Sequence, residues 1–225
     1  MHTVMSEEPG ATPRPRPLIL LIGGMAGSGK SSIATELAHR LGIVRIQPTD
    51  MLREVMRMMI AEPLLPPLHT SSFLAWQSLP GPHGETPTLE HRLVDGYRAQ
   101  SEPVMAGCRA VLARALKERV SMIVEGVHML PGFHRRLPPG VDATVVPVVL
   151  AVPDREQLRA RFRGRGETAP DRRARRYLEH LEAIWQIQRY LLAEAARHGV
   201  PVVENDDWEA AVARILALVE AAQAR

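Results

Sequence analysis

The chain has 225 residues, of which 45% are hydrophobic and 24% charged, so length and composition favour one globular domain and exclude a disordered or fibrous protein. Its apolar runs are far shorter than the roughly 18 residues that a membrane span needs, and the N-terminus lacks the apolar core of a secretory signal. The single cysteine, Cys108, excludes an intramolecular disulfide. We therefore expect a cytoplasmic protein that has no membrane partner.

The net charge of +3 includes one strongly basic segment. Nine arginines and four acidic residues lie between Asp154 and Arg176, which gives this segment a net charge of +5. Nucleic-acid-binding proteins usually spread basic residues over a face and interleave aromatic residues, whereas Phe162 is the one aromatic residue in this segment. The pattern indicates a clamp for a small anion and no nucleic-acid partner.

Residues 1–17 contain four prolines among small and charged residues and are expected to form a disordered tail. From residue 18, β-rich runs alternate with helical patterns, which favours an α/β fold with helices on both faces of a parallel sheet. Strands are expected over residues 18–22, 43–46, 120–124, 145–152 and 200–203, and helices over 33–41, 104–116, 178–192 and 208–219. Prolines and polar residues concentrate over 62–101, so we expect an insertion over about residues 58–101.

Residues 24–31, with the sequence GMAGSGKS, fit the phosphate-loop pattern G-x-x-x-x-G-K-[ST] between an expected strand and an expected helix. In such a loop the backbone N–H groups bind phosphate, Lys30 reaches the β- and γ-phosphates, and Ser31 is a ligand of Mg²⁺. Lys30 and Lys117 are the only lysines among 28 basic residues, which indicates a need for a compact ammonium at position 30. The predicted ATP site comprises Gly24, Ala26, Gly27, Ser28, Gly29, Lys30, Ser31 and Ser32.

An amphipathic helix is expected to begin at Thr49, which would cap it. Its apolar stripe is predicted to comprise Leu52, Val55, Met56, Met59 and Ile60. The opposite face bears Asp50, Arg53 and Arg57, and the helix start lies at the same sheet edge as the phosphate loop. There Asp50 would orient or deprotonate the hydroxyl of an acceptor, while Arg53 and Arg57 would bind its carboxylate or phosphate. The alternative is a solvated face whose charges pair with each other.

The expected strand at 120–124 leads directly into Glu125. A carboxylate at this place beside a phosphate loop is typical of a residue that holds Mg²⁺ or its water, so Glu125 and Ser31 are the predicted metal residues. Whether Asp50 or Glu125 accepts the proton stays open. His128 is a candidate for substrate binding, with local hydrogen bonding as the alternative.

The basic segment places arginines at every second position from 159 to 165, next to Gly164 and Gly166. This pattern predicts a lid over about residues 154–176 that closes on the γ-phosphate and excludes water. Arg161 and Arg165 share a helical face and are the predicted catalytic arginines, and the alternative is a solvated helical face.

Three further segments, together with the phosphate loop, resemble the 2-phosphoglycerate kinases, a family of P-loop small-molecule kinases. They are TDMLREVMR (49–57), LPPLHTSS (65–72) and VEGVHMLPG (124–132), and the resemblance covers roughly residues 18–207. It implies a nucleoside-kinase-like three-layer α/β/α sandwich with a five-stranded parallel sheet, an acceptor-binding insertion and an arginine lid. It also implies ATP-dependent phosphorylation of 2-phosphoglycerate to 2,3-bisphosphoglycerate, with His69, Ser71 and Ser72 in the acceptor pocket.

The resulting hypothesis is that residues 18–225 form a single P-loop kinase domain. It would use ATP and Mg²⁺ to phosphorylate the hydroxyl of a small phosphorylated hydroxy acid. The predicted catalytic residues are Lys30, Asp50, Glu125, Arg161 and Arg165. Two alternatives stay open: a kinase for another acidic metabolite, such as a sugar acid or a polyol phosphate, and a non-catalytic protein that senses ATP.

Overall fold

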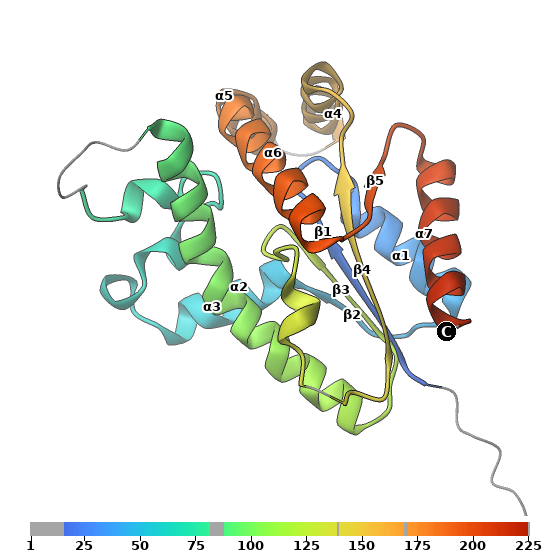
Figure 1. The fold of residues 1–225 in the computed structure, drawn as a ribbon. Coiled ribbons are helices and arrows are strands. Elements are labelled where there is room, and N and C mark those ends of the chain that lie inside the picture. Colours follow the sequence, from blue (N-terminus) through green and yellow to red (C-terminus); the bar gives the residue numbers. More distant parts are fainter. Residues whose placement is uncertain (1–15, 82–87, 139, 169–170, 225) are drawn as a thin grey trace, which may run out of the picture.

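The computed structural model describes residues 16–81, 88–138, 140–168 and 171–224, with the backbone alone at 165–168 and 171–173. Within these residues, five parallel strands form one sheet in the order β2-β3-β1-β4-β5 (Figure 1). The strands are β1 (Leu18–Gly23), β2 (Ile46–Pro48), β3 (Met122–Gly126), β4 (Thr144–Ala151) and β5 (Val202–Glu204). The sheet agrees with the sequence prediction, although β2 begins three residues later than expected, and β3 and β5 each begin two residues later.

Helices cover both faces of this sheet (Figure 1). On one face, α1 (Lys30–Leu41) and α7 (Trp208–Gln223) pack against Leu20 and Ile22 of β1. On the other face, α3 (Leu89–Lys117) and α6 (Leu181–His198) pack against Ile19 and Leu21. The alternation along β1 is what a strand buried between two helical layers requires. The three-layer α/β/α sandwich is therefore confirmed.

The remaining elements lie toward the carboxyl ends of the strands or at the sheet margin. They are α2 (Thr49–Met59), α4 (Arg155–Thr168), α5 (Asp171–Glu179) and the 3-10 helices η1 (Glu62–Leu64), η2 (Pro66–His69), η3 (Ala75–Ser78) and η4 (Phe133–Arg136). The insertion thus consists of three short helical turns and the first part of α3, which begins earlier than the sequence predicted. None of the described helices is long and apolar enough to cross a membrane.

The buried stripe of α2 is narrower than the sequence predicted. Val55 and Met59, both expected on it, are 56% and 81% exposed, so these two assignments are wrong. Leu52 and Met56 do pack against the core. Between them lies Arg53, whose side chain turns inward because backbone carbonyls of the insertion accept its hydrogen bonds. The inward face of α2 is consequently part apolar and part cationic.

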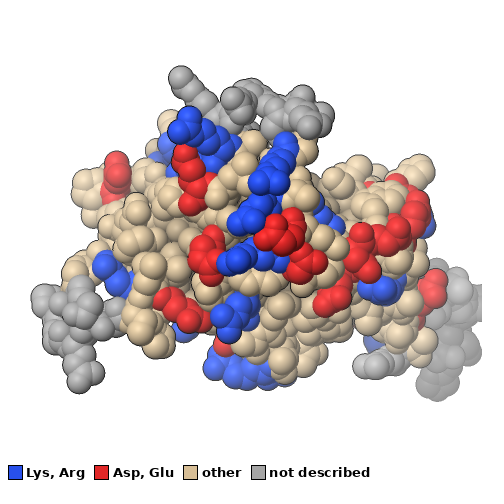
Figure 2. All heavy atoms as spheres, turned by 90° about the horizontal axis from the view of Figure 1, so that it is seen from above, with Lys and Arg blue, Asp and Glu red and all other residues tan. Residues whose placement is uncertain are grey.

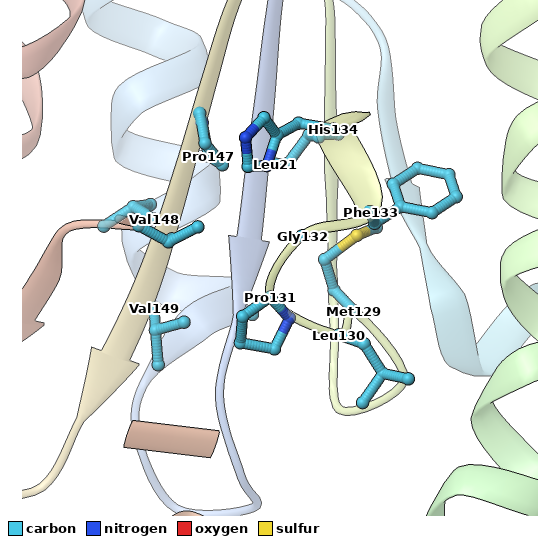
Figure 3. Close-up of a pocket in the computed structure, with 12 residues that line it drawn as sticks. Leu21, Met129, Leu130, Pro131, Gly132, Phe133, His134, Pro147, Val148 and Val149 are labelled. Carbon is cyan, nitrogen blue, oxygen red and sulfur yellow. The ribbon is translucent and has the colours of Figure 1, made fainter. Parts of the chain in front are cut away.

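A small cavity lies between β1, β4 and the loop that follows β3 (Figure 3). Leu21, Pro131, His134 and Val149 are among the residues that line it. Its volume of about 10 Å³ is enough for at most one water molecule. This cavity is therefore too small for a substrate, and the candidate site lies at the carboxyl ends of the strands.

Candidate active site

The phosphate loop connects β1 to α1, and its backbone is arranged to receive an anion. Gly29 precedes α1 with a φ of 89°, and a Cβ at this position would lie 2.5 Å from Nδ2 of Asn205, so a larger residue does not fit. Within the described residues no side chain caps α1, which leaves the N–H groups of its first turn available to phosphate. Asn205 also supports the loop by donating to the carbonyl of Ser28 at 2.8 Å.

Lys30 and Ser31 place an ammonium group and a hydroxyl group in this loop. The buried Nζ of Lys30 donates to the carbonyl of Met25 at 2.8 Å. Oγ of Ser31 donates to Oε1 of Glu125 at 2.9 Å. Burial raises the pKa of Glu125, and the charge of Lys30 and the hydroxyl of Ser31 oppose this rise. A hydroxyl and a carboxylate paired beside a phosphate loop are oxygen ligands of the kind that Mg²⁺ prefers.

A first cavity of about 150 Å³ opens on the phosphate loop. The loop lines it with Ala26, Gly27, Gly29, Lys30, Ser31 and Ser32. Glu125 from the end of β3, Asp50 from the first turn of α2 and Tyr177 from α5 contribute to its walls. The structure therefore brings the predicted metal residues and one predicted acceptor residue to the phosphate loop.

A second cavity of about 270 Å³ adjoins the first. Its polar lining comes from α2, the insertion, α3, α5 and the loop after β3, and comprises Asp50, Arg53, Ser71, Ser72, Gln100, His128 and Tyr177. Ala26, Asp50, Val127 and Tyr177 line both cavities. Two ligands bound in the two cavities would consequently meet at Asp50.

Arg53 joins α2 to the insertion at the second cavity. Its Nη1 donates to the carbonyls of Leu68 at 2.8 Å and Thr70 at 2.9 Å. Its Nη2 donates to the carboxylate of Glu54 at 2.6 Å. These bonds use three of the five N–H donors of a guanidinium, and within the described residues the other two have no partner. Arg53 can therefore hold the insertion and still bind an anion.

His128 is bound at both ring nitrogens. Its Nε2 lies 3.1 Å from Oε1 of Gln100, and its Nδ1 lies 2.9 Å from Oγ1 of Thr49. The amide nitrogen of Gln100 donates to two backbone carbonyls of the insertion, so its Oε1 is the acceptor that faces His128. The proton of the neutral ring therefore sits on Nε2, and Nδ1 accepts from Thr49. This arrangement fits the local hydrogen-bonding alternative for His128.

The same arrangement corrects the expected role of Thr49 as a helix cap, and it leaves the Asp50 carboxylate without a partner in the His128 ring. Pro48, and not Thr49, is the N-cap of α2, because the Thr49 hydroxyl is engaged with His128. Burial lowers the pKa of His128 to about 3, so the ring is neutral at pH 7. Asp50 lies 3.6 Å from the unprotonated Nδ1 and forms no ion pair with it. Its carboxylate is 65% exposed and open to both cavities.

Five residues predicted for the site do not line either cavity in the described part of the chain, and Arg161 of α4 is one of them. Arg57 pairs with Glu54 at 3.3 Å on the outer side of α2. Nε2 of His69 lies 3.0 Å from the carbonyl of Ile60. Gly24 and Ser28 are buried in the loop, where they shape its backbone. The second cavity thus contains one of the two guanidiniums that the sequence pattern places on this helix face.

The basic segment forms α4 and α5, and two of its described arginines, Arg159 and Arg175, pair with acidic residues on their own helices. Arg159 pairs with Glu156 at 2.9 Å. The guanidinium of Arg161 donates to the carbonyls of Gly27 and Asn205, which ties α4 to the back of the phosphate loop. The side chain of Arg165 lies outside the described residues. On the face seen in Figure 2, basic and acidic side chains lie next to each other.

Sequence reasoning missed three residues that shape the site: Gln100, Tyr177 and Asn205. Gln100 follows Leu93 and Tyr97 at helical spacing, and a polar residue on such an apolar stripe is a detectable signal of a buried hydrogen bond. Tyr177 ends an arginine-rich run, and Asn205 follows a short strand. Neither has a local pattern that indicates its neighbours, because both reach the site through tertiary contacts.

Comparison with known proteins places this geometry in a family. The family described as AAA domain matches residues 20–183. The chain belongs to this family. The unliganded crystal structure of a sugar kinase from Janibacter sp. aligns with a TM-score of 0.54 at 17% identity, over 93% of this chain and 98% of that chain. This likeness supports the fold.

Closer relatives confirm the resemblance that the sequence motifs indicate. The chain is 42% identical over 201 residues to a protein of Pyrococcus furiosus named 2-phosphoglycerate kinase, and 44% identical over 200 residues to one of the same name from Thermococcus kodakarensis. Each alignment covers 89% of this chain, but 63% and 65% of the respective relative. The chain therefore spans less than two thirds of the length of these relatives.

Proposed function

We propose that the protein is an ATP-dependent kinase that phosphorylates the hydroxyl of a small anionic metabolite, most specifically 2-phosphoglycerate. The single observation behind this proposal is that a phosphate-loop cavity and a second polar cavity share Asp50. Direct phosphoryl transfer requires the two substrates to be adjacent and in line. The relatives named 2-phosphoglycerate kinase support this choice of acceptor.

The first cavity is proposed to hold the triphosphate of ATP with Mg²⁺. Backbone N–H groups of the loop and the ammonium of Lys30 would bind the phosphates, and Ser31 and Glu125 would hold the metal. Bound there, Mg²⁺ neutralises charge on the β- and γ-phosphates. The arginines of α4 and α5 are proposed to form the lid over this site, with Arg161 and Arg165 as its catalytic members.

The second cavity is proposed to hold the acceptor. Arg53 would bind its carboxylate or phosphate, and the hydroxyls of Ser71 and Ser72 would donate to the same anionic groups. Asp50 would align the acceptor hydroxyl and receive its proton as the new O–P bond forms and the bond to the leaving diphosphate breaks. His128 is neutral and fully hydrogen-bonded within the protein, so its proposed role is to hold Thr49 and the start of α2.

Steady-state release of ADP tests this function. The full chain is assayed with ATP and Mg²⁺ against a panel of hydroxy acids: 2-phosphoglycerate, 3-phosphoglycerate, glycerate, a sugar acid and a polyol phosphate. The proposal predicts acceptor-dependent ADP release with the highest kcat/KM for 2-phosphoglycerate. A higher value for another acid would replace the acceptor. Tight ATP binding without stimulation by any acid would contradict the kinase and favour a nucleotide sensor.

A further inference from the structure

Tyr177 is held in place by aromatic rings from two separate parts of the chain. Its ring stacks on Phe162 of α4, with centroids 4.9 Å apart and an interplanar angle of 17°. It also meets Phe73 of the insertion edge to face, at 5.9 Å and 61°. Paired aromatic rings of this kind limit the movement of a side chain. Tyr177 therefore has a fixed position between the basic segment and the insertion.

That position is the boundary between the two cavities. Of the four residues that line both, Ala26 and Val127 have no polar side-chain atoms, and ionised Asp50 can only accept hydrogen bonds. Tyr177 is thus the shared lining residue whose side chain can donate a hydrogen bond. Its hydroxyl forms no hydrogen bond with any other described residue and is not among the buried unpaired atoms, so it is accessible and can donate a hydrogen bond.

We infer that Tyr177 is a catalytic residue that donates a hydrogen bond from its hydroxyl to the phosphoryl group in transit between the two substrates. This inference rests on the proposed function. The tyrosine keeps its proton throughout: the acceptor oxygen forms the new bond to phosphorus, the bond to the leaving diphosphate breaks, and the acceptor proton passes to Asp50. The hydroxyl stabilises the charge that the phosphoryl oxygens bear in the transition state.

The placement of the nearby cations strengthens this assignment. Lys30 lines the first cavity from the phosphate loop, on the side proposed for the nucleotide. Arg53 lines the acceptor cavity, and not the first cavity, among the described residues. Arg161 donates to two backbone carbonyls at the back of the loop. Tyr177 supplies a hydrogen-bond donor from a third direction, at the boundary between the two cavities.

The test compares Tyr177→Phe with Tyr190→Phe. Phenylalanine keeps the ring and its stacking and removes only the hydroxyl. Tyr190, on α6, meets Tyr97 edge to face at 6.2 Å and does not line either cavity, so it is a matched control. We expect kcat for phosphorylation of 2-phosphoglycerate to fall on the order of 100-fold in Tyr177→Phe, with both KM values within about threefold of the original. Tyr190→Phe should keep the original kcat.

Thermal unfolding and binding of a non-hydrolysable ATP analogue are measured on the same samples to separate catalysis from folding. Unchanged Tm and analogue affinity together with the fall in kcat support the inference. An unchanged kcat in Tyr177→Phe, or a fall matched by a loss of Tm and analogue binding, overturns it while leaving the kinase proposal standing. A wild-type protein that phosphorylates no acceptor overturns both, so the two failures are distinguishable.

Discussion

The two cavities of the candidate site are built in different ways. The phosphate-loop side comes mainly from the consecutive residues of the loop, whose backbone N–H groups and glycine conformations create the binding surface, while Glu125, Asp50 and Tyr177 complete its walls. The acceptor side comes from α2, the insertion, α3 and α5, which side-chain hydrogen bonds to backbone carbonyls hold together. A local motif therefore accounts for most of the first cavity, whereas the second depends on tertiary structure throughout.

This difference predicts separate responses to substitution. Substitutions in the phosphate loop should lower the rate of phosphoryl transfer directly, because few residues lie between the loop and the proposed position of the transferred group. Changes on the acceptor side should affect acceptor binding and the stability of the network together. Asp50 and Tyr177 belong to both cavities, so substitutions there should reduce kcat without a selective effect on one substrate.

The largest effect is expected at Lys30. Lys30→Ala removes the ammonium that is proposed to bind the β- and γ-phosphates, and we expect kcat to fall about 1,000-fold or more. Lys117→Ala is the matched control, because Lys117 is the other lysine of the chain and is exposed at the end of α3. Steady-state kinetics measure both. Equal kcat values for the two variants would remove the phosphate loop from the mechanism.

Asp50→Asn should have the next largest effect. The amide keeps the shape of the side chain but cannot receive a proton, so kcat should fall about 100- to 1,000-fold while both KM values change little. Asp95→Asn, on an exposed part of α3, is the control. If Asp50→Asn retains full kcat, Glu125 becomes the remaining candidate for the proton acceptor.

Gly126 joins the two sides of the site at the end of β3. Its φ is 153°, and a Cβ there would lie 1.8 Å from Oγ1 of Thr49. Gly126→Ala should therefore lower the free energy of unfolding by roughly 3 kcal/mol, from overpacking and backbone strain. Gly42→Ala introduces a Cβ at a φ of 64° into open space and should cost only about 1 kcal/mol. Denaturant titration distinguishes them, and equal losses would contradict a close contact with α2.

His128 should make stability depend on pH. Burial lowers its pKa from 6.5 to about 3, so between these values the unfolded state binds more protons than the folded state. Stability is therefore lost as the pH falls, by about 2 kcal/mol between pH 7 and pH 5 from this group. Denaturant unfolding of wild type and His128→Gln at both pH values isolates the contribution. The same pH dependence in both proteins would show that His128 is protonated without penalty.

The smallest effect is expected for Arg53. Arg53→Ala should raise KM for the acceptor about tenfold and leave KM for ATP unchanged, because the guanidinium lines only the acceptor cavity among the two. Arg57→Ala removes a guanidinium that pairs with Glu54 outside the cavity and should leave both KM values unchanged. A rise in acceptor KM for Arg57→Ala and not for Arg53→Ala would contradict this assignment. It would mean that α2 rotates and brings Arg57 into the second cavity before the acceptor binds.

Features that depend on local sequence patterns could be predicted, and features that depend on tertiary contacts could not. The parallel sheet and the phosphate loop were predictable, because strand patterns and the spacing of Lys30 and Ser31 are local, whereas the metal role of Ser31 and Glu125 stays a prediction. The lid role of Arg161 stays a prediction, and the hydrogen bonds described for this residue are with backbone carbonyls that no sequence pattern reveals.

The sequence indicated several of the polar residues proposed for the acceptor side, but it did not indicate which of them contact each other. Arg53 and Arg57 are equivalent on a helical wheel, yet carbonyls of the insertion bind only the first of them. Gln100 and Tyr177 enter the site because α3 and α5 pack against the insertion, at distances along the chain that local patterns do not cover. Tertiary packing, and not residue type, decides which polar side chains line the second cavity.

A crystal structure with a non-hydrolysable ATP analogue, Mg²⁺ and 2-phosphoglycerate tests the central claim most directly. The account predicts triphosphate on the phosphate loop, the acceptor in the cavity lined by Arg53, Ser71 and Ser72, and the acceptor hydroxyl within hydrogen-bond distance of Asp50. Binding of the acceptor elsewhere, such as in the separate cavity of about 470 Å³ between η3, α3 and α6, would contradict it.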